Sequence, residues 1–218
     1  MDTRSGAVVS VNVGSARSIG AKSGQTGIEK LPVAGTVEVR EPTGDDLSGL
    51  VGDRICDVQA HGGRYQAVYA YASEDYWWWA ENYDIEARPG FFGENVTTEG
   101  LDLTEAEVGE SWKIGSDLEL SVTSPRIPCS TFQVWVGRSG WIKTFRKECR
   151  PGAYLKVVHG GLIGKGDPVV VTTKPGHGVT IGLMFRALTT DGSLLGRLEP
   201  AFDYLDPTAR QYILDSRR

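Results

Sequence analysis

The sequence has few cysteines and lacks the features of a secreted, membrane-spanning or nucleic-acid-binding protein. Its three cysteines, at positions 56, 129 and 149, are an odd number without the paired spacing of zinc sites, which argues against a disulfide framework or a zinc knuckle. No apolar run approaches the roughly 20 residues of a membrane span, and the first six residues lack the apolar core of a signal peptide. A net charge of −5 argues against a broad basic surface for nucleic acid. We therefore expect a cytoplasmic globular protein without membrane or nucleic-acid partners.

Glycine, in contrast, is abundant, and many of the 28 glycines fall between short β-branched runs. Alternating or β-branched runs favour strands, and glycines between them suit the tight turns and corners of a closed sheet. The pattern therefore predicts a mainly β protein, a β-barrel with inserted helices. The clearest predicted strands are residues 7–13, 36–40, 118–123, 154–158 and 168–172.

Two inserted segments have helical patterns. Ser73 is placed as the N-cap of a helix that continues to about Tyr83, with two acidic residues in its first turn. Three consecutive tryptophans, 77–79, lie about 100° apart around this helix, so at least one is expected to be partly exposed. A second helix is predicted over residues 139–149, where apolar residues recur at helical spacing.

The composition changes after Thr173. A Lys-Pro-Gly-His-Gly segment at 174–178 is typical of a linker, so we place a domain over residues 1–173 and a C-terminal module over residues 179–218. The module shows no obvious chemistry, and a packing or dimer contact is the default interpretation. Its three predicted helical pieces are residues 181–188, 194–204 and 208–214, the last preceded by Asp206 as cap and Pro207 as first residue.

The most informative cysteine lies in the run Ser124-Pro125-Arg126-Ile127-Pro128-Cys129. The prolines disfavour helix in the residue before each of them, so the thiol is expected on a stiff, extended segment. The neighbouring guanidinium favours the thiolate, which is the form that attacks electrophiles and binds soft metals. Local sequence alone leaves two interpretations open, a positioned sulfur ligand or nucleophile and a buried structural cysteine.

Other glycine-bounded motifs suggest the walls of a pocket. His61 precedes two glycines, so a ligand can approach the backbone closely there. If basic side chains of these segments converge, they can hold an anion such as a phosphate. These basic residues are Arg17, Lys22, Lys30, Arg54 and Arg126. Structural interpretations stay open beside this one: Asn95 and Thr97 as loop braces, Glu94 and Asp53 as turn caps, His61 as a structural histidine, and Lys30 and Arg17 as parts of a solvated rim.

The order of these motifs resembles the MOSC domain, the C-terminal domain of molybdenum cofactor sulfurases, which also occurs as a free-standing protein. The resemblance covers about residues 7–172 and is closest to the YiiM-like subgroup, in which a small three-helix module follows the β-barrel. The motifs that carry it are Asn12-Val13-Gly14, the segment 26–33, Gly52-Asp53-Arg54, His61-Gly62-Gly63, the segment 89–97, the run ending at Cys129, and Arg150-Pro151-Gly152-Ala153-Tyr154.

The resemblance implies a molybdenum cofactor (Mo-molybdopterin) as the ligand of the pocket. Carried over, Cys129 is the metal-facing thiolate and, with His61, the catalytic pair. Asn95, Thr97 and Arg126 stand at positions expected to line the pocket, and Lys30 at one expected to bind the anionic end. Arg54 and Arg17 complete the expected set of cofactor-binding residues. Binding of pyridoxal phosphate is also implied at the family level.

The function implied by the resemblance is reduction of N-hydroxylated compounds, with N-hydroxylated purine bases such as 6-hydroxylaminopurine as substrates. Since the chain has no flavin motif and no cysteine set for an iron–sulfur cluster, a separate reductase is expected as electron donor. The alternative is a carrier of molybdenum cofactor or of sulfane sulfur on Cys129. A metal-free thiol hydrolase that uses Cys129 and His61 is a third reading, and a homodimer is left open.

Overall fold

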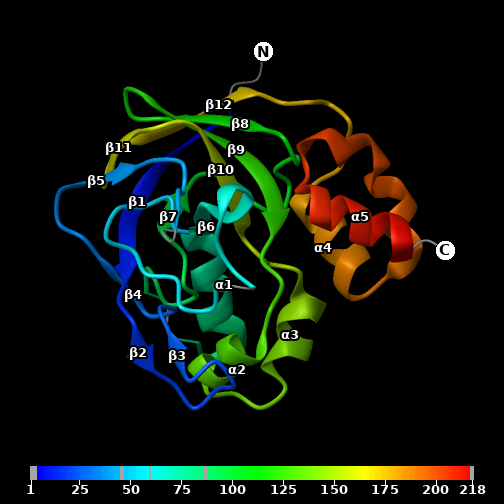
Figure 1. Ribbon diagram of the computed structural model, residues 1–218, viewed down its shortest axis with the longest axis horizontal. Helices are drawn as coiled ribbons and strands as arrows, with labels where there is room; N and C mark the ends of the chain where they lie inside the picture. Colours follow the sequence, from blue (N-terminus) through cyan, green and yellow to red (C-terminus); the bar gives the residue numbers. More distant parts are fainter. Residues whose placement is uncertain (1–3, 45–46, 59, 86–87, 217–218) are drawn as a thin grey trace.

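The computed structural model of the chain describes residues 4–44, 47–58, 60–85 and 88–216, and its main body is a closed β-barrel (Figure 1). Seven strands pair in the order β12-β8-β9-β10-β6-β7-β1, and β1 closes the ring on β12. Neighbouring strands are antiparallel except β6 and β7, which run parallel. The strands are β1 (Ser5–Gly14), β6 (Val68–Ala72), β7 (Val96–Glu99), β8 (Ser111–Ile114), β9 (Leu118–Pro125), β10 (Ala153–His159) and β12 (Pro168–Thr173).

Short strands extend or flank the barrel. The strand β4 (Lys30–Pro32) pairs with the end of β1. Two further pairs stand apart: β5 (Thr36–Val39) with β11 (Gly161–Gly164), and β2 (Arg17–Ser18) with β3 (Gln25–Thr26). The predicted fold class is therefore confirmed, and each clearly predicted strand is present within a residue or two of its expected bounds.

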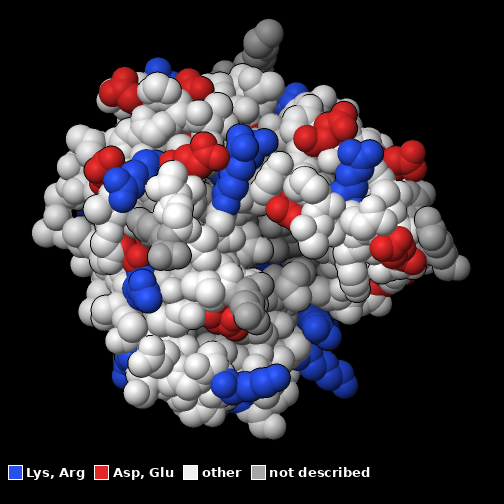
Figure 2. All heavy atoms as spheres, in the orientation of Figure 1, with Lys and Arg blue, Asp and Glu red and all other residues white. Residues whose placement is uncertain are grey.

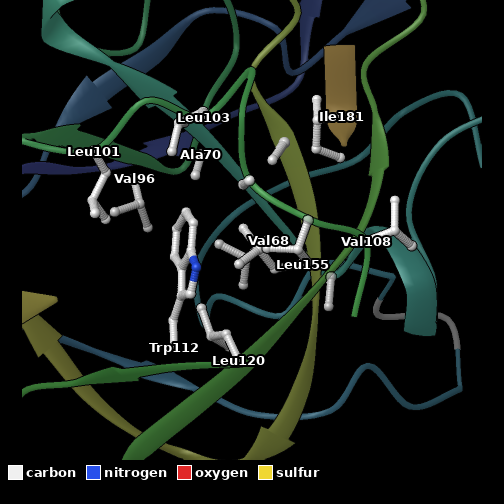
Figure 3. Close-up of a cluster of buried hydrophobic side chains, with 14 of the residues drawn as sticks. Val68, Ala70, Val96, Leu101, Leu103, Val108, Trp112, Leu120, Leu155 and Ile181 are labelled. Atoms are coloured by element: carbon white, nitrogen blue, oxygen red, sulfur yellow. The ribbon is translucent and has the colours of Figure 1, made fainter. Parts of the chain in front are cut away.

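Apolar side chains fill the barrel, because successive side chains of each strand point alternately into the barrel and away from it. On β9 and β10, for example, Leu120 and Leu155 point inward and lie near Trp112 of β8 and Val68 of β6 (Figure 3). All of these side chains are buried. Burial of this kind stabilises the fold by about 25 cal/mol per Å² of apolar surface removed from water.

Three helices inserted between barrel strands share a second, aromatic core. They are α1 (Ser73–Tyr83), α2 (Ser130–Val136) and α3 (Trp141–Glu148). In α1, Trp79 is fully buried and stacks on Phe145 of α3, whereas Trp77 is 60% exposed. The expectation that one tryptophan of the triplet reaches the surface is confirmed.

Two sequence-based expectations about helices need correction. Ser73 is the first residue of α1 rather than its cap, and its hydroxyl bonds to Glu74 instead of a backbone N–H. The helix α2, which starts directly after Cys129, was not predicted. Its seven residues are too few to show a helical period, and the prolines before it indicated extended chain.

The C-terminal residues form helices that pack against the barrel. They are α4 (Ile181–Thr189), a 3-10 helix η2 (Gly192–Tyr204) and α5 (Pro207–Ser216). As predicted, the Asp206 carboxylate caps α5, accepting the N–H of Thr208 at 2.8 Å. Ile181 lies within the same hydrophobic cluster as barrel residues such as Val108 (Figure 3). The boundary between residues 1–173 and 179–218 stays a prediction. No helix in the described part of the chain is long and apolar enough to cross a membrane.

Candidate functional site

One cavity lies where several loops of the barrel meet, and it collects most of the predicted site residues. Its walls come from the segment around β3, residues 53–57, the His61 loop, the first part of β6 and β10, and the link from β9 to α2. The predicted residues that line it are Lys30, Arg54, His61, Asn95, Arg126 and Cys129. Arg17 and Thr97 are not among its lining residues.

Cys129 lies immediately before the first turn of α2, with extended backbone (φ −119°, ψ 172°) as Pro128 led us to expect. Burial alone would raise the pKa of this thiol. A hydrogen bond with the His61 side chain, the charge of Arg126 and the N–H of Phe132 outweigh it and lower the pKa of Cys129 from 9.0 to about 6. Cys129 is therefore mostly a thiolate at neutral pH.

Arg126 lines the cavity and is buried. Its guanidinium lies 3.7 Å from the ring centroid of Phe132 and 5.7 Å from that of Tyr69, and it hydrogen-bonds the Tyr154 hydroxyl. Within the described part of the chain, its Nη1 has no hydrogen-bond partner. A buried, unpaired charged donor is costly, so this atom is available for an anionic ligand.

His61 is held by its own loop. Its backbone N–H donates to the Asp57 carbonyl at 3.0 Å. The next residue, Gly62, has φ +85°, and a Cβ there would come within 2.7 Å of Ile55 and Leu47. Only glycine fits this position, so Gly62 holds the backbone of the loop that carries His61, whose side chain hydrogen-bonds Cys129.

Lys30 and Asn95 are committed to a buried network centred on Asp53. The Lys30 ammonium pairs with the Asp53 carboxylate, which also accepts the N–H of Gly14 and the hydroxyl of Ser48. Asn95 donates to the same carboxylate at 2.9 Å. Burial alone would raise the pKa of Asp53, but Lys30 and the hydrogen bonds lower it overall. Asp53 is therefore more than the turn cap we expected, and Lys30 lines the cavity with its charge already balanced.

Thr97, Arg17 and Arg54 lie away from the centre of the site. The Thr97 hydroxyl donates to the buried Glu94 carboxylate, which also accepts the N–H of Gly90, so Thr97 and Glu94 brace the 89–97 loop. Arg17 is exposed, pairs with Glu29 and lies over the ring of Trp135. Arg54 reaches the cavity but is largely exposed.

The structure adds cavity residues that the sequence did not identify. Tyr69 and Tyr154 both contact Arg126, and their rings lie 5.0 Å apart. Tyr154 ends a motif that carried the family resemblance, which was the available signal. Cys56, to which no role was assigned, lines the same cavity as Cys129, and nothing in its local sequence indicated this.

The donor set fits a cofactor that brings its own metal ligands. Within the described residues, no group of three or more His, Cys, Asp or Glu side chains could hold a bare metal ion. A metal already held by a dithiolene needs only one soft protein donor, and a thiolate such as Cys129 suits it. The unpaired Nη1 of Arg126 supplies a charged donor for the anionic part of such a ligand.

Residues 57–170 match the family model of the MOSC domain. The chain belongs to the MOSC domain family. The match includes His61, Asn95, Arg126 and Cys129, and it covers the barrel strands from β6 to β10. The predicted resemblance is thereby confirmed.

The relatives of this MOSC chain differ in the share of their own length that the chain covers. It is 25% identical to the uncharacterized protein YflK of Bacillus subtilis over 194 residues, which cover 88% of this chain and 85% of YflK. It is 26% identical to YiiM of Escherichia coli over 150 residues, 67% of this chain and 64% of YiiM. A protein of Gibberella moniliformis named reductase is 30% identical over 138 residues, 59% of this chain but only 23% of the reductase.

Solved structures support the fold. The structure of YiiM from Geobacillus stearothermophilus superposes with a TM-score of 0.78 at 24% identity, covering 98% of this chain and 100% of that one. YiiM from Escherichia coli superposes with a TM-score of 0.72 at 20% identity, covering 100% of this chain and 92% of that one. The YiiM-like arrangement of barrel and C-terminal helices is thus common to these chains.

Proposed function

We propose that this chain binds molybdenum cofactor and reduces N-hydroxylated compounds with electrons from a separate protein. The observation that carries the proposal is a low-pKa thiolate beside a buried arginine with an unpaired Nη1, both lining one cavity. These groups match the two needs of the cofactor, a soft ligand for the metal and a cation for its anionic part. N-hydroxylated purine bases such as 6-hydroxylaminopurine are the substrate class we infer from membership of the family.

The reaction consumes two electrons and two protons: R–NHOH + 2e⁻ + 2H⁺ gives R–NH₂ and water. When bound, the cofactor would supply the redox chemistry that cleaves the N–O bond. Cys129 would hold the metal as thiolate, and Arg126 would bind the anionic end. His61, hydrogen-bonded to Cys129, would orient the sulfur. The ring of Phe132 and the hydrogen bond to the Tyr154 hydroxyl would keep the Arg126 guanidinium in place.

An external electron donor is part of this proposal. The sequence offers no flavin motif and no cysteine set for an iron–sulfur cluster. We therefore infer that a flavin- or iron–sulfur-containing reductase, a separate protein, supplies the electrons.

The first test is the molybdenum and pterin content of protein purified from a host that makes the cofactor. We expect near-stoichiometric molybdenum in the wild type and at least a tenfold loss in Cys129→Ser, since the ligand thiolate is removed. Cys56→Ser is the matched control, because it makes the same change in the same cavity and should retain the metal. Absence of molybdenum from the wild type would overturn the proposal.

The carrier alternative is separated by a second measurement on the same samples. Protein loaded with cofactor is supplied with dithionite as reductant and 6-hydroxylaminopurine as substrate. Formation of adenine that depends on Cys129 supports the reductase. Bound cofactor without turnover, or a persulfide on Cys129 detected as one extra sulfur by mass spectrometry, would favour a carrier of cofactor or sulfur.

A further inference from the structure

A groove on the outside of the inserted helices has a charge opposite to that of the whole chain. It lies between α3 and the C-terminal end of α4, and we call it the basic groove. Its lining contains no described carboxylate, although the chain carries a net charge of −5. Figure 2 shows lysine and arginine side chains projecting from the lower right of the main body, where Figure 1 draws α3. The charged and hydroxyl residues of the groove are Lys143, Arg146, Lys147, Arg186, Thr189 and Thr190.

The cations of the basic groove are poorly neutralised by the protein itself. Lys143 is exposed, and no ion pair involves it within the described residues. The Nε of Arg146 is buried without a hydrogen-bond partner in the same part of the chain. Arg186 donates to the Cys149 sulfur at 3.8 Å, and Lys147 pairs with its neighbour Glu148. Lys143, Arg146 and Arg186 thus have no carboxylate partner within the described residues, and such a cluster attracts a partner of negative charge.

The basic groove is connected to the candidate site by a single helical turn. Gln133 of α2 lines the groove, and its backbone N–H donates to the carbonyl of Cys129 at 3.1 Å. One turn of helix rises about 5.4 Å, so the wall of the groove starts within a short distance of the thiolate. A partner bound in the groove would therefore lie against the element that follows the candidate metal ligand.

We propose that the basic groove docks the acidic surface of the protein that donates electrons to the site, an inference that rests on the proposed function. Its volume of roughly 710 Å³ far exceeds the space of one small anion and fits several side chains of a partner. Its cations come from two different helices, α3 and α4, so the positive charge extends beyond the face of a single helix. In each turnover, two one-electron carriers would dock in succession, each losing one electron to the site while the solvent supplies the two protons.

Binding of an acidic [2Fe–2S] ferredoxin by the full chain tests the docking surface directly. We expect wild-type affinity to fall steeply between 20 and 200 mM salt, because charges steer and hold the complex. The double variant Lys143→Glu with Lys147→Glu should weaken binding on the order of tenfold or more at low salt. Lys165→Glu, a single substitution of the same kind in the exposed turn between β11 and β12, is the control and should bind as the wild type does. Equal binding by all three proteins, or no binding by the wild type at low salt, would overturn the docking surface.

Turnover with two reductants separates this inference from the proposed function. For each protein, the rate with reduced ferredoxin is divided by the rate with dithionite, which needs no docking. We expect this ratio to fall on the order of tenfold in the double variant and to stay unchanged in Lys165→Glu. An unchanged ratio in the double variant counts against the groove as a docking surface. Absence of turnover by the wild type with dithionite counts against the proposed function. The binding measurement decides on the groove even in that second case.

Discussion

Cys129 illustrates how neighbours decide the chemistry of one side chain. The same thiol in an apolar pocket would be an inert, protonated packing residue, as the raised pKa of Cys149 shows, where burial is the largest cause. At Cys129, burial is opposed by His61, Arg126 and a backbone N–H, and the pKa falls to about 6. Two half-buried cysteines of one chain thus have opposite character.

We predict that alkylation of Cys129 by iodoacetamide is half-maximal near pH 6. In His61→Ala, the loss of the hydrogen bond to the thiolate should raise this midpoint by about one pH unit. The measurement is the rate of modification against pH, with the site assigned by peptide mass. Cys129→Ser removes the low-pH phase and serves as the control. A wild-type midpoint above pH 8 would contradict the geometry.

The lowered pKa of Cys129 also makes the folded protein more stable at high pH than at low pH. Because the folded pKa lies below the unfolded one, the group contributes most above the unfolded pKa near 9, and the contribution disappears as pH falls through about 6. The difference in free energy of unfolding between the wild type and Cys129→Ser should therefore grow between pH 6 and pH 9. Urea unfolding of both proteins at a series of pH values measures this difference.

Short polar elements around the cavity are held by one buried ion pair. Lys30 on β4 and Asp53 tie together the end of β1, the 48–53 loop and the Asn95 loop. Apolar burial cannot do this, because β4 has only three residues and two of them are exposed. Polar contacts therefore replace a hydrophobic core in this part of the fold.

We predict that Lys30→Met destabilises the protein by about 3–5 kcal/mol, since it leaves the Asp53 carboxylate buried without its partner. Lys22→Met, at an exposed position nearby, should change the free energy of unfolding by less than about 0.5 kcal/mol. Urea denaturation measures both. Near-wild-type stability of Lys30→Met would free Lys30 for the cofactor-binding role that its motif position implies.

The helix α1 allows two chemically identical substitutions to be compared on one element. Trp79 is fully buried in the aromatic core, whereas Trp77, two residues earlier, is 60% exposed. We predict a loss of about 3–5 kcal/mol for Trp79→Ala, from lost burial and the cavity left behind, and less than about 1 kcal/mol for Trp77→Ala. Chemical denaturation of the pair tests this. Equal losses would mean that Trp77 is covered by a contact with another chain.

Elements with a clear periodicity were predictable, and those set by tertiary contacts were not. The strand β1 and the helix α1 carry enough residues for a pattern to emerge. The strands β2 and β3 have two residues each, and their pairing depends on the loop that joins them. The helix α2 is stabilised by packing of Phe132 in the aromatic core rather than by its own propensity, so local reasoning missed it.

In the molecule as a whole, the candidate site is made by segments that are far apart in the sequence. The family motifs named Cys129, His61 and Arg126, and the fold brings all three to one cavity. Motif membership does not say which residues face a ligand and which hold the loops. Thr97 belongs to a family motif but holds a loop: its hydroxyl donates a hydrogen bond to Glu94 and accepts one from Asn12.

The hydrophobic core joins the barrel and the C-terminal helices into one continuous cluster. Ile181 lies in the same cluster as Val108, and its backbone N–H donates to the Ala106 carbonyl at 2.9 Å (Figure 3). We predict that α4 and the strands β9 and β10 lose hydrogen-exchange protection together, with similar opening free energies, because neither part can unfold without exposing the shared core. Exchange measured by mass spectrometry at increasing urea would show this. If α4 instead opened at a free energy several kcal/mol below that of the strands, the C-terminal helices would be a separate folding unit, as the linker at 174–178 suggests.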